Sequence, residues 1–217
     1  MVRVMRKLRI LITAGPTREP IDPVRFISNR SSGKMGFALA EAARKAGHDT
    51  ILVSGPVSLP PPRGVRLTAV ETADEMRRAV LREARHANLI IMAAAVADYT
   101  PAEPARQKIK KNAPTLRLLL RKTPDILQEL GKRKTSAQTL VGFAAETSLV
   151  LPRARAKLIA KNLDFIVANR VGIPGSGFES THNLATVLAR DGRRFPFPRL
   201  TKRRLAGCLL TLFTKSM

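Results

Sequence analysis

The feature that most constrains the fold is a regular alternation of short apolar runs with longer segments of helical periodicity. Such an alternation is typical of parallel βαβ units. We therefore expect an α/β protein with a Rossmann-like, doubly wound, mainly parallel sheet, helices on both faces and ligands at the carboxyl ends of the strands. The expected strands are Leu8–Thr13, Thr50–Ser54, Val65–Ala69, Leu89–Ala94, Leu140–Ala144 and Phe165–Ala168, and the expected helices are Gly33–Ala46, Ala73–Ala87, Asp125–Lys132, Ala154–Lys161 and Lys202–Thr214.

Two segments do not fit this alternation. Thr115–Leu120 reads TLRLLL and is strand-like, either as a separate strand or as an edge of the main sheet. Leu184–Phe197 predicts a small β extension, a hairpin that reverses at the two residues Asp191 and Gly192. Pro196 and Pro198 in its second half predict an edge position, because proline cannot donate to a neighbouring strand.

Length and composition favour a single globular domain spanning residues 1–217. Apolar residues make up 44% of the chain and charged residues 25%, the balance of a soluble protein, and no apolar run reaches the length of a membrane span. The basic N-terminus leads directly into a short apolar run and then TAGPTREP, which favours a first buried strand over a signal peptide. The single cysteine, Cys208, excludes an internal disulfide and predicts a cytoplasmic protein.

The chain is strongly basic. Lys and Arg total 39 against 16 acidic residues, a formal net charge of +23, which predicts an attraction to anionic ligands. A basic nucleic-acid-binding module is therefore one alternative function. However, aromatic residues for base stacking make up only 4% of the chain and no zinc-finger or RNA-recognition motif is present, so we expect no specific nucleic acid partner.

The segment from Ile10 to Gly36 predicts an anion site. It passes from an apolar strand, through a turn at Gly15, to the sequence SSGKMG at the start of a helix. Backbone N–H groups around Ser31 and Gly33 and the helix dipole would favour a phosphate or carboxylate. The spacing is neither the dinucleotide fingerprint nor the P-loop, so an ordinary capped helix fits the bare pattern equally well. The absence of the dinucleotide fingerprint also argues against a second alternative function, that of an NAD(P)-dependent oxidoreductase.

The literal sequence carries more information than the spacing. ITAGPTREPIDPVRFISNRSSGKMG closely resembles the opening of bacterial phosphopantothenoylcysteine synthetase, the ligase of coenzyme A biosynthesis. Four later strings follow in that family's order and extend the resemblance over nearly the whole chain: AAAVADY (93–99), KIKK (108–111), GFAAET (142–147) and KNLDFIVAN (161–169).

The resemblance implies a reaction. The carboxylate of 4′-phosphopantothenate would attack the α-phosphate of CTP, releasing pyrophosphate, and L-cysteine would then displace CMP from the acyl-cytidylate. It also implies Mg²⁺ carried by the nucleotide phosphates, and a homodimer in which residues 100–122 form a mobile loop and a dimerisation strand. Family members commonly carry a fused decarboxylase; only about seven residues precede the first expected strand, so we expect that activity to come from a separate partner, if at all.

The resemblance assigns catalytic roles to Asn29 and Lys108. Without it, Asn29 would be read as a turn residue and Lys108 as part of a solvated basic run. An amide at position 29 can donate to a developing oxyanion, and a loop lysine can neutralise charge on the reacting phosphate. Arg25, Asn29 and Ala94 are the implied contacts to the acyl substrate, with Arg25 suited to holding a phosphate or carboxylate by two bonds.

The remaining implied contacts are to the nucleotide. Asp98 by itself would be an equally good helix cap and Phe143 a core residue, whereas Lys157 and Lys161, four residues apart on one helical face, could bind one phosphate chain together. The nucleotide-binding set is Gly15, Ser31, Gly33, Met92, Ala93, Ala94, Asp98, Lys108, Pro124, Asp125, Ile126, Leu127, Phe143, Lys157 and Lys161. The three histidines, His48, His86 and His182, have no metal-ligand spacing, so no protein-bound metal site is expected.

Overall fold

The computed structural model describes residues 7–111, 114–171 and 180–217, whose strands form an eight-stranded sheet and two short two-stranded sheets. In space the main sheet runs β12-β11-β10-β9-β6-β1-β4-β5, and neighbouring strands from β5 to β10 are parallel. These strands are β1 (Arg9–Ala14), β4 (Asp49–Ser54), β5 (Arg66–Ala69), β6 (Leu89–Met92), β9 (Thr139–Glu146), β10 (Phe165–Arg170), β11 (His182–Ala189) and β12 (Arg194–Thr201).

The order of the parallel strands confirms the expected fold class. Numbered along the chain, they lie in the order 3-2-1-4-5-6, which is that of doubly wound nucleotide-binding sheets. The order reverses between β1 and β6, so the crevice where such sheets bind ligands lies beyond the carboxyl ends of these two neighbours.

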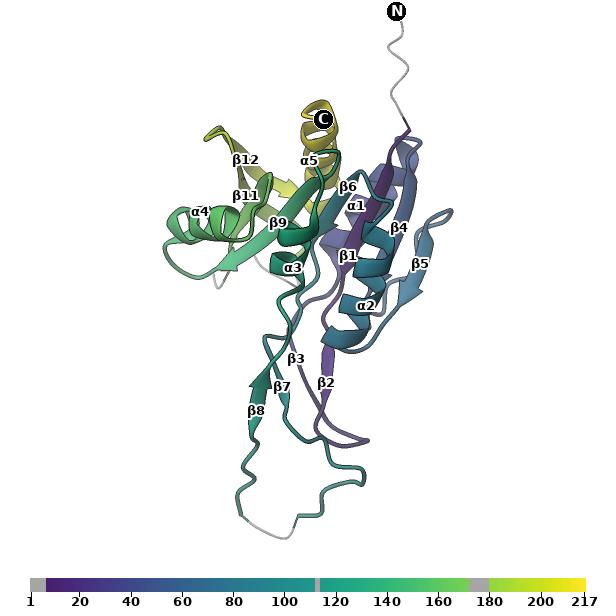
Figure 1. The fold of residues 1–217 in the computed structure, drawn as a ribbon, viewed down its shortest axis with the longest axis vertical. Coiled ribbons are helices and arrows are strands. Elements are labelled where there is room, and N and C mark those ends of the chain that lie inside the picture. Colours follow the sequence, from purple (N-terminus) through teal and green to yellow (C-terminus); the bar gives the residue numbers. More distant parts are fainter. Residues whose placement is uncertain (1–6, 112–113, 172–179) are drawn as a thin grey trace, which may run out of the picture.

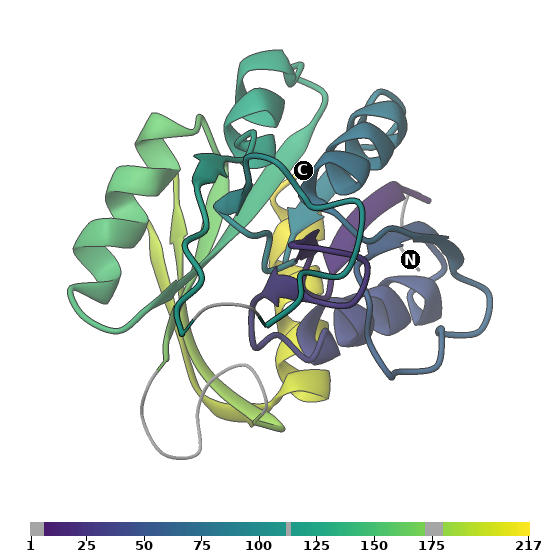
Figure 2. The same cartoon turned by 90° about the horizontal axis from the view of Figure 1, so that it is seen from below.

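Helices cover both faces of the sheet, as Figures 1 and 2 show. α1 (Lys34–Lys45) and α5 (Lys202–Lys215) pack on one face, and α2 (Ala73–Ala84), α3 (Ile126–Arg133) and α4 (Val150–Ala160) pack on the other. Strand β1 contributes to both cores: Ile10 and Ile12 pack toward α1 and α5, while Leu11 packs toward the other three helices. All three side chains are fully buried, which explains the continuous apolar run in the sequence.

A slender projection extends from the edge of the sheet where the parallel strands end (Figure 1). It contains two antiparallel strand pairs: β2 (Arg18–Pro20) with β3 (Phe26–Ser28), and β7 (Tyr99–Pro101) with β8 (Leu120–Lys122). We call residues 18–28, 99–111 and 114–122 the arm, and the sheet with its helices the body.

The structure distinguishes between the two readings of Thr115–Leu120. Only Leu120 of this segment is in a strand, β8, which pairs with β7 in the arm rather than with an edge of the main sheet. Leu116 and Leu119 are 54% and 80% exposed, so the described residues do not cover the apolar side chains of this segment. The proline-edged hairpin is confirmed as β11 and β12, with β12 at the sheet edge. It reverses over three residues, Arg190 to Gly192, because the Ala189 N–H donates to the Arg193 carbonyl, and Gly192 takes a positive φ of 96°.

The start of α1 lies at the predicted anion turn, and a glycine caps it. The helix begins at Lys34, and its N-cap residue, Gly33, has a φ of 74° and makes no side-chain capping bond. The Ser31 hydroxyl instead accepts a bond from the Gly33 N–H at 3.3 Å. The N–H groups of the first turn of α1 have no partner within the helix, and this end of the helix lines the ligand crevice.

Candidate active site

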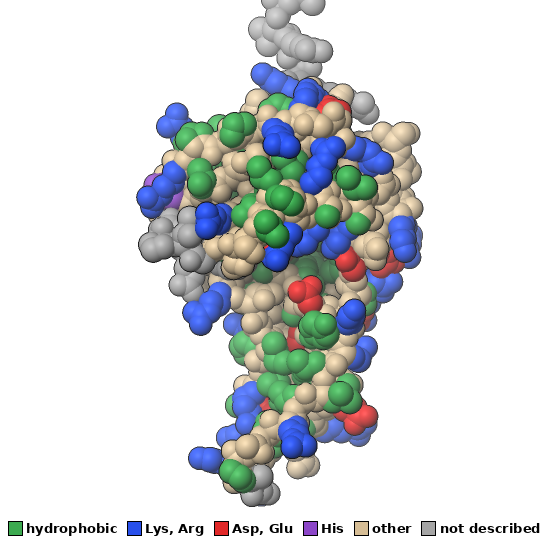
Figure 3. Space-filling model, turned by 90° about the vertical axis from the view of Figure 1, so that its left-hand side faces the viewer, with side chains coloured by type: hydrophobic (Ala, Val, Ile, Leu, Met, Phe, Trp, Pro, Cys, Tyr) green, Lys and Arg blue, Asp and Glu red, His purple; other side chains and the backbone are tan. Residues whose placement is uncertain are grey.

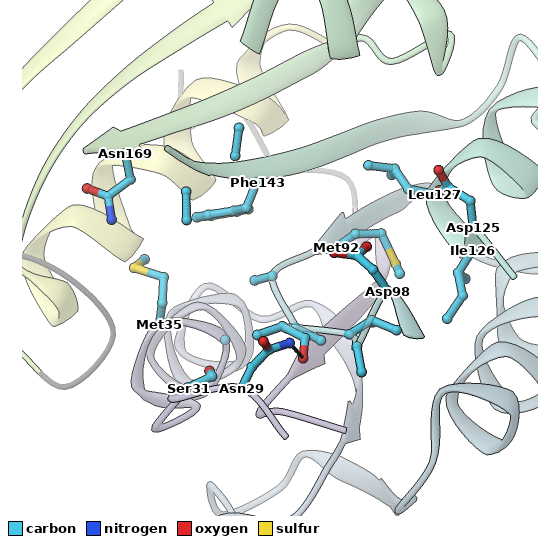
Figure 4. Close-up of a pocket in the computed structure, with 18 of the residues that line it drawn as sticks. Asn29, Ser31, Met35, Met92, Asp98, Asp125, Ile126, Leu127, Phe143 and Asn169 are labelled. Carbon is cyan, nitrogen blue, oxygen red and sulfur yellow. Dashed lines mark hydrogen bonds between the residues drawn. The ribbon is translucent and has the colours of Figure 1, made fainter. Parts of the chain in front are cut away.

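A cleft of about 740 Å³ lies beyond the carboxyl ends of β1, β6, β9 and β10. Its walls come from segments far apart in the chain: the loop before α1, the residues after β6, the start of α3, the end of β9 and one face of α4. In Figure 4, Asn29, Asp98 and Phe143 surround its central space. The volume suits a ligand of nucleotide size.

One wall is the loop that follows β6, and hydroxyl groups near β1 fix its shape. The Thr13 hydroxyl accepts a bond from the Ala94 N–H at 3.1 Å, and the Thr17 hydroxyl accepts one from the Ala97 N–H at 3.0 Å. The Asn29 amide donates to the Ala95 carbonyl at 3.0 Å, as the dashed line in Figure 4 shows. This holds Asn29 against the loop that contains Ala93 and Ala94.

The start of α1 forms the neighbouring wall. Ser31 and Gly33 line the cleft, and Gly36 lets the helix approach β1, since a Cβ there would lie 2.5 Å from that of Ala14. Gly15 packs against Gly33 on the side away from the cleft, and a Cβ on Gly33 would lie 3.4 Å from the Gly15 nitrogen. The predicted anion turn is therefore one packed unit, and its helix dipole points at the cleft.

The opposite wall combines an aromatic ring with the start of α3. Phe143 on β9 is half-buried and lines the cleft together with Ile126 and Leu127. Asp125 caps α3 by accepting a bond from the Gln128 N–H at 2.9 Å. This set offers an aromatic face and apolar contacts, which suit a planar base.

Each of the two predicted cleft lysines, Lys157 in α4 and Lys161 directly after it, has a carboxylate partner. The Lys157 ammonium lies 2.6 Å from Glu146, and the Lys161 ammonium lies 2.8 Å from Asp125. Burial is the largest single influence and raises the pKa of each carboxyl, but the lysine hydrogen bond, the lysine charge and further hydrogen bonds together outweigh it, so both pKa values lie below the ordinary value. Both carboxylates are therefore ionised at neutral pH and hold the lysines toward the cleft.

Three predicted residues are not among those that line the cleft in the described part of the chain: Gly15, Arg25 and Lys108. Gly15 lies behind the anion turn. Arg25 and Lys108 are on the arm, where Arg25 pairs with Asp22 and Lys108 is exposed. All other predicted site residues line the one cleft.

Sequence reasoning missed several polar residues that line the cleft: Lys34, Asn169, Asn183 and Lys202. Asn169 closes the quoted string KNLDFIVAN at the end of β10, a signal that was available. Asn183 and Lys202 follow no motif. Burial, and to a smaller extent the charge of the nearby Lys34, lowers the pKa of the Lys202 ammonium to about 8.

Residues 7–111, 114–171 and 180–217 lack both a cluster of metal-ligating side chains and a membrane-spanning helix. They contain no gathering of three or more His, Cys, Asp or Glu side chains suited to a metal ion. None of their helices has the length and apolar character needed to cross a bilayer.

Comparisons with known proteins agree with this geometry. The model of the DNA/pantothenate metabolism flavoprotein C-terminal domain matches residues 5–216. The chain belongs to this family. It is 48% identical over 211 residues to the coenzyme A biosynthesis bifunctional protein CoaBC of Vibrio cholerae, which covers 96% of this chain and 53% of that protein. It is 50% identical over 194 residues to CoaBC of Bacillus subtilis, covering 89% of this chain and 48% of that protein.

Solved structures of the DNA/pantothenate metabolism flavoprotein family have the same fold. The crystal structure of the C-terminal domain of CoaBC aligns with a TM-score of 0.83 at 42% identity, over 98% of this chain and 96% of that chain. A Cab2 variant in complex with phosphopantothenate-cysteine aligns with a TM-score of 0.77 at 18% identity, which supports the fold alone. The chain spans about half the length of the curated relatives it matches.

Proposed function

We propose that this chain is a phosphopantothenate–cysteine ligase that uses CTP and forms an acyl-cytidylate intermediate in coenzyme A biosynthesis. The observation that carries the proposal is the cleft itself. It brings the anion turn of α1, the Phe143 ring and the two paired lysines of α4 around one nucleotide-sized space, in a chain about half identical to CoaBC proteins.

In the first step, a carboxylate oxygen of 4′-phosphopantothenate forms a bond to the α-phosphorus of CTP, and pyrophosphate leaves. The N–H groups at the start of α1 and the ammonium groups of Lys157 and Lys161 would bind the phosphates. Glu146 and Asp125 already hold those lysines toward the cleft, so little side-chain ordering remains when the nucleotide binds. Phe143 would stack on the base, and Met92, Pro124, Ile126 and Leu127 would enclose it.

In the second step, the amine of L-cysteine attacks the acyl carbon, the bond to the phosphate oxygen breaks, and CMP leaves. Asn29 is fixed to Ala95 through one N–H of its amide, and the second N–H is available to the acyl oxygen as negative charge develops there. Lys108 would neutralise charge on the departing phosphate, and closure of the arm would keep water from the reactive anhydride.

Magnesium would travel with the triphosphate, bound mainly by phosphate oxygens and water. Asp98 is an exposed carboxylate that lines the cleft, whereas Asp125 is paired with Lys161, so Asp98 is the residue placed to meet a hydrated cation. The ion would supply charge compensation for the phosphates.

A homodimer would complete the site. Arg25 and Lys108 lie on the arm rather than in the cleft of their own chain, and the arm exposes Val24, Phe26, Tyr99 and Leu119. Figure 3 shows apolar side chains, in green, on the projection below the body. We propose that the arms of two copies pack together through this surface, each bringing its cations to a cleft. Sedimentation of the protein at twice the mass of one chain would support this.

The same proposal places the protein in the cytoplasm, where its nucleotide and cysteine substrates are available. A flavin-dependent decarboxylase, on this or another polypeptide, would consume the product.

The proposal is tested by mixing the protein with Mg²⁺, CTP, 4′-phosphopantothenate and L-cysteine and measuring pyrophosphate and the amide product. We expect one pyrophosphate for each phosphopantothenoylcysteine formed, and a lower KM for CTP than for ATP. A protein that forms no product with either nucleotide would contradict the ligase assignment, and a preference for ATP would contradict the nucleotide assignment alone.

A further inference from the structure

Asp22 is a buried carboxylate on the exposed arm, and the sequence motifs assign it no role. It lies in the turn between β2 and β3, and its side chain has no exposed surface. One oxygen, Oδ1, accepts bonds from the Val24 and Arg25 N–H groups, both at 2.9 Å. These two bonds form an Asx turn, which accounts for the contacts of Oδ1 but not for those of Oδ2.

The other oxygen, Oδ2, connects two segments that are far apart in the sequence. It accepts bonds from the Arg25 guanidinium, with the Nε atom at 3.0 Å, and from the Ile109 N–H at 3.1 Å. Arg25 Nη2 in turn donates to the Ile109 carbonyl at 2.8 Å. Both polar backbone groups of Ile109 are therefore held by the Asp22–Arg25 pair, and a further bond from the Ala105 N–H to the Ile21 carbonyl fastens the same segment.

Ile109 directly follows Lys108, the cation proposed to act on the departing phosphate. A lysine side chain has four rotatable bonds, so its position is controlled mainly by where the backbone holds its Cα. The hydrogen bonds from Arg25 keep the pKa of the Asp22 carboxyl well below its usual range, so the pair stays charged at every pH where the protein would work.

We propose that Asp22 is a positioning residue that, through Arg25 and the Ile109 backbone, sets where the arm presents Lys108. The inference rests on the proposed function. It assigns to the β2–β3 turn the task of fixing the Lys108 segment, and it couples the two arm cations, Arg25 and Lys108, through one carboxylate.

The main test is Asp22→Asn. Asparagine keeps the oxygen that accepts from Val24 and Arg25, but its amide nitrogen cannot accept from the guanidinium or from Ile109. We expect kcat for pyrophosphate release to fall about 10- to 100-fold, the range typical when a supporting hydrogen bond behind an active group is removed. The KM and Kd for CTP should change less than about twofold, because the cleft is untouched.

Asp191→Asn is the matched control. Asp191 also holds a nearby arginine, accepting from Arg193 Nε at 2.8 Å and from its N–H at 3.0 Å, but it lies at the β11–β12 turn, away from the arm. Its substitution should leave kcat unchanged. Equal losses in the two variants would show a general stability effect and would overturn the positioning role.

A double-mutant cycle with Lys108→Gln separates the two proposals. If Asp22 acts through Lys108, adding Asp22→Asn to Lys108→Gln should cost less than about a further twofold in kcat. Losses that multiply would overturn the positioning role and leave the ligase assignment standing. A Lys108→Gln variant with full activity would overturn the proposed role of Lys108, and with it the positioning role.

Amide hydrogen exchange tests the contact itself, without relying on turnover. The Ile109 amide should exchange more slowly than a free amide in the unaltered protein, and this protection should be lost in Asp22→Asn while β1 amides stay protected. Free exchange of the Ile109 amide in the unaltered protein would overturn the inference.

Discussion

The body and the arm place their functional groups in different ways. In the body, Phe143, the start of α1 and the lysines of α4 are positioned by buried strands and packed helices, and they line one cleft. On the arm, Lys108 and Arg25 are exposed, and hydrogen bonds to a single buried carboxylate hold their segments together. Under the proposed function this difference becomes a division of labour, in which the body would bind the nucleotide and the arm would supply charge to the reaction.

Lys108→Gln should have the largest effect, and it tests the arm. We expect kcat to fall about 100- to 1,000-fold, as when a single charge-stabilising donor is removed from an active site. The Kd for CTP, measured by calorimetry, should stay nearly constant because Lys108 lies outside the cleft. Lys111→Gln, in the same basic run, is the control and should retain normal turnover. Loss of CTP binding in Lys108→Gln would break the proposed division between body and arm.

Phe143→Ala tests the body, and here we expect CTP binding to change. Loss of stacking on the base should weaken CTP binding by about 1–3 kcal/mol, or roughly 10- to 100-fold in Kd. Phe195→Ala removes another half-buried ring, on β12 and outside the cleft, and should leave the Kd for CTP unchanged. If both variants bind CTP as tightly as the unaltered protein, Phe143 is not part of the nucleotide site.

Gly36→Ala tests how tightly the body holds the anion turn. The new Cβ would lie 2.5 Å from the Ala14 Cβ and 2.7 Å from the Thr13 carbonyl oxygen, so α1 must move away from β1. We expect a loss of about 1–3 kcal/mol in the free energy of unfolding, measured with urea. Gly207→Ala in α5 is the matched control: nothing lies within 4 Å of its Cβ, so the substitution should stabilise the helix by up to about 1 kcal/mol. Destabilisation by Gly207→Ala alone would contradict this account of the packing.

The sequence predicts the body of the protein better than it predicts the contacts of the arm. The continuous apolar runs at Ile10–Ile12 and Leu89–Ile91 predicted strands buried on both faces, and the order of the strands then placed the cleft. Lys202 and Asn183 were missed because a lone polar residue reaches the cleft only through tertiary packing. Asp22 was missed because its partner Ile109 is 87 residues away. The sequence left two readings of TLRLLL open because a local apolar pattern cannot show which strand is the partner.

A smaller effect should come from His48, at the end of the body distant from the arm. Its ring is buried, Nδ1 accepts a bond from the Leu8 N–H, and Nε2 has no partner among the described residues. Burial lowers the pKa of this imidazole, so below about pH 6.5 the unfolded chain takes up a proton that the folded chain refuses. Stability should therefore fall as the pH falls below that value, by at most about 1.4 kcal/mol per pH unit from this group.

Urea titrations between pH 7.5 and 5 measure the effect of His48. A His48→Gln variant should lose part of the pH dependence, whereas the exposed His86→Gln variant should keep it. The same slope in all three proteins would mean that His48 does not control the acid sensitivity of the body.

The most direct test of the central claim is pyrophosphate release in the absence of cysteine. With CTP, Mg²⁺ and 4′-phosphopantothenate alone, the account predicts a burst of up to one pyrophosphate per active site, followed by a halt while the acyl-cytidylate stays bound. Turnover should then resume when L-cysteine is added. Continuous release without cysteine, or release that does not require 4′-phosphopantothenate, would contradict the account.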